Sequence, residues 1–388
     1  MRKFVRWIRR ITLLLVLAAV VVGVWKRDDI RRLLAVNSLF SEGKIVHNFS
    51  HMQDLFYHAA MARGAGPVSP LPPGVPATLP PTVTDWLTQR NATSLLVMKN
   101  GTVVYEDYLQ GTAPEDLRIS WSMAKSFLSA LIGIELTEGK IASLDDQVTK
   151  YAPLLVGSAY DGATIRNVLQ MESGVAFNED YLDYNSDINK MGRVLALGGS
   201  MDAFAAGIKT RRATPGTSWQ YVSIDTHVLG MVLRGATGQS IPDLMDAKIM
   251  KPLGLEADPV YLTDGHGVAF VLGGLNMRTR DYARFGQMIA NGGQWQGQQI
   301  VPADWIDAST KASANTTPDE LGYGYQWWVP HDAGPGEFMA RGIYGQYIYI
   351  IRPLGVVIVR TAADRGFEDA GVEAQDIAMF RMIAKGLP

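Results

Sequence analysis

Residues 122–139 read SMAKSFLSALIGIELTEG, and the prediction of the fold starts from this stretch. Its apolar positions recur at helical spacing, and Gly139 stands where a helix would end, so a buried helix is predicted to begin at Ser122. Lys125 follows Ser122 by three residues, and residues at this spacing share one face of a helix. The stretch therefore predicts an ammonium group beside a hydroxyl group at the first turn of a core helix.

This arrangement indicates nucleophilic chemistry. A serine hydroxyl is a poor nucleophile until a neighbour takes its proton, and lysine can do so only when burial or nearby cations lower its pKa. The unpaired backbone N–H groups of the first helical turn also stabilise negative charge. A second Ser-x-x-Lys match, Ser41-Glu-Gly-Lys44, opens no apolar helix. Ser122 is therefore the candidate nucleophile, with Lys125 as its activating partner.

Strand signals lie on both sides of a helical middle. Asn100-Gly101, a strong hairpin signal, separates two β-rich runs at 94–99 and 102–108. Further strands are predicted at 323–329, 345–351 and 356–362, with a closing helix from about Ala370, while helical patterns predominate at about 145–290. This order predicts an α+β fold, an antiparallel sheet flanked by helices with an inserted α-helical subdomain.

The N-terminus carries an export signal. Five cations within residues 1–10 precede an uncharged apolar run, Ile11–Trp25, with no small-x-small cleavage site after it. We predict a cytoplasmic basic segment at 1–10 and a transmembrane signal-anchor at 11–25. The catalytic body would then lie outside the cytoplasm, in the periplasm, tethered to the cytoplasmic membrane. The run is shorter than the roughly 20 residues of a full span, so a cleaved signal peptide is the alternative.

Residues 26–82 are predicted to form a linker or arm, because 64–81 (GAGPVSPLPPGVPATLPP) is too rich in proline for helix or central strand. The folded body is predicted to span 83–388.

Composition excludes several function classes. The 36 Lys and Arg nearly balance 38 Asp and Glu, so no basic field exists to hold nucleic acid. The chain has no cysteine, which excludes disulfides, thiolate zinc sites and cysteine nucleophiles. His47 and His51 could share a helix face, but no third ligand follows at a metal-site spacing. Neither a metal nor a cofactor is predicted.

Several ordered motifs resemble one enzyme family. The tetrad and its helix are followed by five further segments: Thr164-Ile-Arg-Asn-Val-Leu-Gln-Met-Glu-Ser-Gly174, Pro215-Gly-Thr-Ser-Trp-Gln-Tyr-Val-Ser223, residues 273–286, Gly322-Tyr-Gly-Tyr-Gln-Trp-Trp328 and Gly342-Ile-Tyr-Gly-Gln346. Over about residues 83–388 the chain resembles the penicillin-recognising serine hydrolases. These include serine β-lactamases, D-alanyl-D-alanine peptidases and class-C-like esterases, and the resemblance is closest to the 6-aminohexanoate-dimer hydrolase branch.

The resemblance implies a β-lactamase/transpeptidase-like fold and a role for each matching position. Ser122 would be the nucleophile, Lys125 its activating partner, and Tyr221 the general base and later acid. Backbone N–H groups of Ser122 and Ile343 would form the oxyanion hole. The remaining matches would contact substrate or relay protons beside it: Tyr181, Ser223, Trp328 and Gly342.

Two departures from the family pattern bear on the substrate. The last active-site strand carries Gly342-Ile-Tyr344 where β-lactamases and peptidases have Lys-Thr-Gly or His-x-Gly, and Ser223 stands in place of asparagine. We therefore expect a serine hydrolase that acts through an acyl-enzyme on small linear esters or amides, with weak or absent β-lactamase activity. The alternatives are a D-alanyl-D-alanine peptidase, a weak β-lactamase, or a non-catalytic membrane-tethered sensor.

A different nucleophilic arrangement is also conceivable. His227 lies close to Asp225 in the sequence, which suggests a Ser/His/Asp triad. No Gly-x-Ser-x-Gly elbow accompanies this pair, so a packed or surface histidine is the favoured interpretation.

Overall fold

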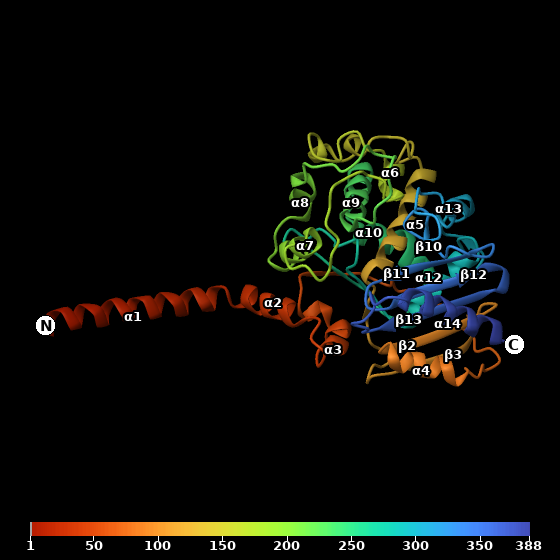
Figure 1. Ribbon diagram of the computed structural model, residues 1–388, viewed down its shortest axis with the longest axis horizontal. Helices are drawn as coiled ribbons and strands as arrows, with labels where there is room; N and C mark the ends of the chain where they lie inside the picture. Colours follow the sequence, from red (N-terminus) through yellow and green to blue (C-terminus); the bar gives the residue numbers. More distant parts are fainter. Residues whose placement is uncertain (1) are drawn as a thin grey trace.

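A long N-terminal helix projects from a layered body (Figure 1). The computed structural model describes residues 2–388, with side chains from residue 4 onward. Part of the predicted basic segment, Met1 and the side chains of Arg2 and Lys3, therefore lies outside the described residues. Helix α1 (Arg2–Trp25) contains a stretch, Phe4–Trp25, that is long and apolar enough to cross a membrane. It extends further toward the N-terminus than the predicted run at 11–25.

Helix α1 continues into α2 (Arg27–Ser38) almost without interruption. The Lys26 N–H donates to the Val22 carbonyl at 2.8 Å, and the Ile30 N–H donates to the Lys26 carbonyl at 2.9 Å. These are i to i−4 bonds of helical type, so they join the two helices across Lys26.

A seven-stranded antiparallel sheet forms the centre of the body, in the order β3-β2-β13-β12-β11-β10-β9. Its strands are β2 (Ala92–Lys99), β3 (Thr102–Tyr108), β9 (Gly322–Tyr323), β10 (Trp328–Val329), β11 (Glu337–Gly342), β12 (Gln346–Ile351) and β13 (Val356–Ala362). Strand β2 pairs with β13, so the first and last predicted strands share one sheet. Asn100 and Gly101 both have positive φ, at 50° and 80°, as a two-residue type I′ turn requires.

Helices cover both faces of this sheet. Along β13, Val357 and Val359 belong to the core on one face, and Val356 and Ile358 to the core on the other, because strand side chains alternate. The first face packs against α5 (Ala124–Thr137) and α12 (Thr279–Ala290), and the second against α4 (Pro81–Gln89) and α14 (Val372–Gly386). The predicted α+β class is confirmed.

The helical lobe is inserted between β3 and β9, as Figure 1 shows above the sheet. Its central helix, α9 (Ser223–Thr237), packs against α5 and its neighbours in the lobe. The other elements of this part of the chain are α6 (Ile165–Leu169), α7 (Asp187–Ala196), α8 (Met201–Gly207), α10 (Ile241–Met245), α11 (Lys251–Leu253) and α13 (Ala303–Ser309), with a small hairpin of β7 (Gln294–Trp295) and β8 (Gln298–Gln299).

A second sheet joins the N-terminal arm to the body. Its order is β1-β5-β6-β4, with β1 (His58–Ala60), β4 (Arg118–Ile119), β5 (Val260–Leu262) and β6 (Leu275–Met277). The arm also forms α3 (Ile45–Ser50), from which the Phe49 side chain is fully buried. Residues 26–82 thus contribute both a strand and core side chains, and they wrap the body.

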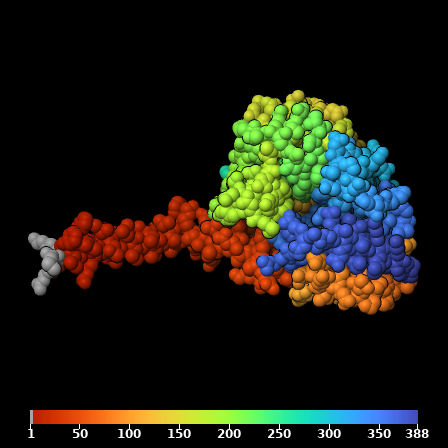
Figure 2. Space-filling model, viewed as in Figure 1, coloured from red at the N-terminus to blue at the C-terminus, as the bar shows by residue number. Residues whose placement is uncertain are grey.

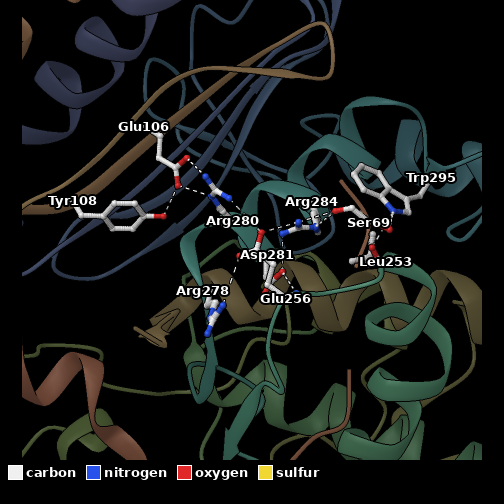
Figure 3. Close-up of polar contacts among 10 residues, drawn as sticks. All are labelled: Ser69, Glu106, Tyr108, Leu253, Glu256, Arg278, Arg280, Asp281, Arg284 and Trp295. Atoms are coloured by element: carbon white, nitrogen blue, oxygen red, sulfur yellow. Dashed lines mark hydrogen bonds and ion pairs between the residues drawn. The ribbon is translucent and has the colours of Figure 1, made fainter. Parts of the chain in front are cut away.

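Ion pairs fasten helix α12 to its neighbours (Figure 3). Arg280 makes two bonds of 2.7 Å with Glu106 on β3. The buried Arg284 donates to Glu256 at 2.9 Å, to Asp281 at 3.0 Å, and to the Ser69 carbonyl in the proline-rich segment. Arginine suits such a position because its guanidinium fork serves several acceptors at once.

Candidate active site

Ser122 lies at the junction between the small sheet and helix α5. The Ser120 N–H donates to the Leu275 carbonyl at 2.8 Å, which fixes the chain just before Ser122. A 3-10 turn, Trp121–Met123, then leads into α5. Trp121 has a φ of 43°, in the left-handed region that a bulky residue adopts only under strain. Such strain is concentrated at functional sites, where the surrounding structure holds it in place.

Lys125 points at the Ser122 hydroxyl. Its Nζ lies 2.9 Å from the Ser122 Oγ, 3.3 Å from the Ser223 Oγ and 2.8 Å from the Leu272 carbonyl oxygen. The side chain is 1% exposed. Burial lowers the pKa of Lys125 to about 7, although the nearby carboxyl groups of Glu179 and Asp225 oppose this shift. An amine with such a pKa is partly unprotonated at neutral pH, so it can accept a proton.

Tyr221 lies on the other side of the lysine. The Lys125 Nζ is 5.3 Å from the centre of the Tyr221 ring. Burial raises the pKa of the Tyr221 phenol, and the charge of Glu179 adds to this, while the nearby Ser122 and Ser223 hydroxyls lower it by a smaller amount. The phenol is therefore protonated at neutral pH. The expected role of Tyr221 as general base and later acid stays a prediction.

Glu179 was not among the site residues predicted from the sequence, and it binds the hydroxyl groups of Tyr181 and Ser223. It accepts hydrogen bonds from the Ser223 Oγ, from the Ser223 N–H at 3.0 Å and from the Tyr181 hydroxyl at 2.7 Å. Two of the predicted substrate-contacting residues, Tyr181 and Ser223, are thus fixed by one carboxylate. The sequence could have pointed to Glu179 only through its position two residues before Tyr181, a predicted site residue.

Strand β11 ends against Ser122. A Cβ atom on Gly342 would lie 2.5 Å from the Ser120 carbonyl oxygen and 3.0 Å from the Ser122 nitrogen. Only glycine lets the strand approach this closely. The next residue, Ile343, lines the same cavity as Ser122, so the two backbone positions proposed for an oxyanion hole are neighbours in space.

Trp328 and Arg341 lie behind Tyr221. The Trp328 ring is 5.2 Å from the Tyr221 ring, and the Arg341 guanidinium lies 5.6 Å from the Trp328 ring centre. Arg341 is ion-paired with Glu373 on α14. Trp328 thus packs on Tyr221, and its expected role as a substrate contact stays a prediction. The positive charge of Arg341, next to Gly342, is thus paired with the carboxylate of Glu373.

His227 does not join this site. Its Nε2 lies 2.7 Å from Asp202 Oδ1, which links α9 to α8, while Asp225 accepts a bond of 2.7 Å from the Tyr160 hydroxyl. The two residues of the conceivable triad therefore serve separate contacts within the helical lobe.

A cavity of about 250 Å³ opens beside Ser122. The body lines it with Ser223, Tyr181, Ile343 and Tyr344, among others. The N-terminal arm supplies further wall through Phe40, whose ring stacks on Tyr344 at 4.8 Å. The arm is thus part of the site, which the prediction of a linker did not anticipate.

Known proteins resemble this chain in sequence and in fold. A family model described as Beta-lactamase matches residues 83–379. The 6-aminohexanoate-dimer hydrolase of Paenarthrobacter ureafaciens is 29% identical over 333 residues, 81% of this chain and 84% of that protein.

Solved structures extend the likeness in fold. A candidate 6-aminohexanoate-dimer hydrolase from Bacillus anthracis has a TM-score of 0.79 at 23% identity, with 90% of this chain and 97% of that one covered. A family VIII carboxylesterase has a TM-score of 0.61 at 15% identity, with 81% and 99% covered. The predicted β-lactamase/transpeptidase-like architecture is confirmed by these structures.

The family match takes in helix α5, the segment through Tyr221 and the end of β11, so it includes the elements of the body that meet at Ser122, while the N-terminal arm lies outside it. It spans most of the chain and agrees with the resemblance that the sequence motifs indicated. The chain belongs to the beta-lactamase family, a family of hydrolases, and is related to a 6-aminohexanoate-dimer hydrolase.

Proposed function

We propose that the protein is a serine hydrolase that cleaves small linear esters or amides through an acyl-enzyme on Ser122. The observation that carries this proposal is the 2.9 Å contact between the Ser122 Oγ and the Lys125 Nζ, in a setting that lowers the pKa of the lysine to about 7. A nucleophile within hydrogen-bond reach of an unprotonated base is the arrangement that acyl transfer requires.

In acylation, the Ser122 Oγ attacks the substrate carbonyl carbon as its proton passes to the Lys125 Nζ. The negative charge that forms on the carbonyl oxygen is stabilised by backbone N–H groups at Ser122 and Ile343. The bond to the leaving group then breaks. Tyr221 donates its phenol proton to the departing oxygen or nitrogen and takes one from Lys125, so the first product leaves as an alcohol or amine.

In deacylation, Lys125 removes a proton from water, and the resulting hydroxide attacks the acyl carbon. The bond to the Ser122 Oγ breaks, the acid is released, and the serine oxygen regains its proton from Lys125. The directions of the two pKa shifts support this assignment, because the lysine is the group that lacks a proton at neutral pH and the tyrosine is the group that keeps one.

The end of β11 favours esters and amides over β-lactams. Gly342 occupies the place of the family's lysine, and the neighbouring Arg341 is engaged with Glu373 and Trp328. A β-lactam or peptide carboxylate would therefore lack a free cation from this strand. Neutral acyl groups do not need one.

We also propose that α1 remains as a membrane anchor and that the body lies outside the cytoplasm. The helical hydrogen bonds across Lys26 join α1 to α2, and this continuity supports an uncleaved segment. We expect the full-length chain to stay with the membrane during alkaline extraction. We also expect protease added to spheroplasts to digest the body. A soluble chain that begins after Trp25 would contradict it.

The activity is tested with p-nitrophenyl acetate and butyrate, nitrocefin, a D-alanyl-D-alanine peptide and a linear aminohexanoate amide. We expect turnover of the esters or the amide and little of nitrocefin. Ser122→Ala should lose at least a thousandfold in kcat with an unchanged melting temperature, since it removes the nucleophile. Efficient cleavage of nitrocefin or of the peptide would select the β-lactamase or peptidase alternative.

A single burst of nitrophenol without further release would identify the sensor alternative. In that case the acyl group would remain on Ser122, and its mass would be found on the intact protein hours after mixing.

A further inference from the structure

We infer that the substrate is an amphiphile taken from a membrane surface, and that its apolar chain occupies the cavity between α2 and α7. This inference rests on the proposed hydrolase function and names the class of substrate. Four features of the cavity and its surroundings carry it.

The first feature is the apolar lining. Helix α7 contributes Ile188, Met191 and Leu195, and the segment before β6 contributes Phe270 and Leu272. The nucleophile opens onto the same space. A narrow apolar cavity next to a reacting hydroxyl suits a hydrocarbon chain whose carbonyl end lies at Ser122, because burial of each methylene is favourable.

The second feature is the origin of the facing wall. Val36, Leu39 and Phe40, at the end of α2 and just after it, line the cavity. Trp25 and Val36 are eleven positions apart. At 1.5 Å per helical residue this places the wall about 16 Å along the chain from the end of the apolar helix α1. A membrane that holds α1 would therefore lie close to the cavity.

The third feature is two exposed apolar side chains close in sequence to lining residues, since Leu182 follows Tyr181 and Leu34 lies two residues before Val36. Leu182, in the loop before α7, is 86% exposed, and Leu34, on α2, is 61% exposed. Helices α2 and α7 are in contact, so these side chains belong to neighbouring elements. Figure 2 shows the N-terminal segment against this part of the helical lobe. Exposed apolar groups on neighbouring segments indicate an interaction surface.

The fourth feature is a tyrosine and an arginine at the same opening. Tyr184 is largely exposed, and both Tyr184 and Arg193 line the cavity. The Arg193 guanidinium lies 4.1 Å from the Tyr184 ring centre and donates to the Tyr184 carbonyl at 2.9 Å. Tyrosine is enriched at lipid–water boundaries, and a cation there attracts anionic headgroups. The opening thus has the chemistry of a membrane interface.

The first experiment measures chain-length selectivity of the full-length protein. We expect kcat/KM for p-nitrophenyl decanoate to exceed that for acetate at least tenfold. Val36→Phe narrows the cavity and should lower this decanoate-to-acetate ratio about tenfold. Equal rates for the two esters in the wild type, or an unchanged ratio in the variant, would overturn the inference. Absence of turnover with either ester would instead mean that the proposed hydrolase function is wrong.

The second experiment tests delivery from the bilayer. The full-length chain is reconstituted in vesicles of phosphatidylethanolamine and phosphatidylglycerol that contain a fluorogenic long-chain ester. Leu34→Ser with Leu182→Ser should lower turnover of the vesicle ester, relative to dissolved acetate, about tenfold. The matched control, Leu154→Ser with Val156→Ser, removes two exposed side chains outside the cavity lining and should leave the ratio unchanged. Equal effects of the two pairs would show that the substrate enters from water.

Discussion

At the scale of single residues, Lys125 can act as a base because the fold keeps water from its ammonium group. The carboxyl groups of Glu179 and Asp225 lie close enough to raise the pKa of Lys125 and so oppose the effect of burial. Burial raises the pKa of Asp225 to about 8, so at pH 7 that group is mostly protonated and carries little charge. Glu179 is therefore the main carboxylate that opposes the effect of burial on Lys125, and it accepts hydrogen bonds from Ser223 and Tyr181. The result is a lysine that titrates near neutrality.

The pH dependence of turnover follows from this titration. Only unprotonated Lys125 accepts the serine proton, so kcat/KM for a neutral ester should rise with pH through a midpoint near 7. The raised pKa of Tyr221 keeps its proton in place, so no loss from that group is expected up to pH 9. Initial rates between pH 5 and 9 provide the measurement. A rising limb with its midpoint above pH 9 would mean that Lys125 remains protonated and is not the base.

Gly342 provides a second prediction. The methyl group of Gly342→Ala would meet the Ser120 carbonyl and displace the strand end from the nucleophile. Loss of one oxyanion-hole donor typically lowers kcat about a hundredfold or more, so kcat of Gly342→Ala should fall by at least that factor. Gly207→Ala, where a Cβ meets open space, is the control. Wild-type turnover in Gly342→Ala would show that the close approach of β11 does not matter.

The sequence could predict part of this site. The spacing of Ser122 and Lys125 on one helix implied their contact, since an i, i+3 pair depends on local geometry alone. Glu179 is 44 residues from Ser223 and meets it through a loop, so no local spacing signals the contact. The direction of the Tyr221 pKa shift likewise depends on burial by distant segments. The catalytic roles remain predictions.

At the scale of elements, helix α5 is positioned by a glycine. A Cβ on Gly133 would lie 2.2 Å from the Trp305 ring on α13. The glycine lets the indole lie directly on the helix, which fixes how α5, and with it Ser122 and Lys125, sits against its neighbours. Glycine inside a helix costs roughly 1 kcal/mol of helix propensity, so its presence here requires such a packing reason.

Gly133→Ala should therefore destabilise the protein despite the better helix propensity of alanine. Overpacking of this kind costs about 1–3 kcal/mol. The free energy of unfolding is measured by urea titration, with Gly207→Ala as the matched change at a helical glycine that has open space beside it. An unchanged or higher midpoint in Gly133→Ala would contradict the packing described for α5 and α13.

Elements with strong local patterns were predictable, and those that depend on partners were not. Strand β13 has the predicted bounds, because its run of β-branched residues is continuous. Strand β11 was not predicted, since Glu337-Phe-Met-Ala-Arg-Gly342 has no clear alternation and is stabilised by pairing with β12. The helical insertion was predicted, but strands β5 and β6 within it are three residues each and are defined by their pairing.

At the scale of the whole molecule, the N-terminal arm connects the apolar helix to the catalytic body. It buries Leu39, Ile45 and Phe49 in the main core. It also supplies two hydrogen-bond acceptors for the buried Arg118, the Val46 carbonyl at 2.9 Å and the Ser50 Oγ at 2.7 Å. Arg118 is on β4, three residues before Trp121. The arm thus stabilises the segment that carries Ser122.

Two truncations separate the anchor from the arm. Removal of residues 1–25 takes away exposed helix, so the melting temperature and the turnover of dissolved acetate should stay close to those of the full chain. Removal of residues 1–50 deletes three buried side chains worth about 1.5–3 kcal/mol each, which approaches the stability of a typical domain. The longer truncation should unfold or aggregate, as measured by calorimetry and gel filtration. Equal stability of the two products would show that the arm is only a tether.

The central claim is that Ser122 forms the acyl-enzyme, and covalent labelling tests it most directly. The full-length protein is treated with a fluorophosphonate, and the site of attachment is found by mass spectrometry of the intact chain and its peptides. The account predicts one adduct per chain, on Ser122, with none in Ser122→Ala and slow labelling in Lys125→Ala. A folded protein that takes up no label, or that takes it up equally at another residue in Ser122→Ala, would contradict the account.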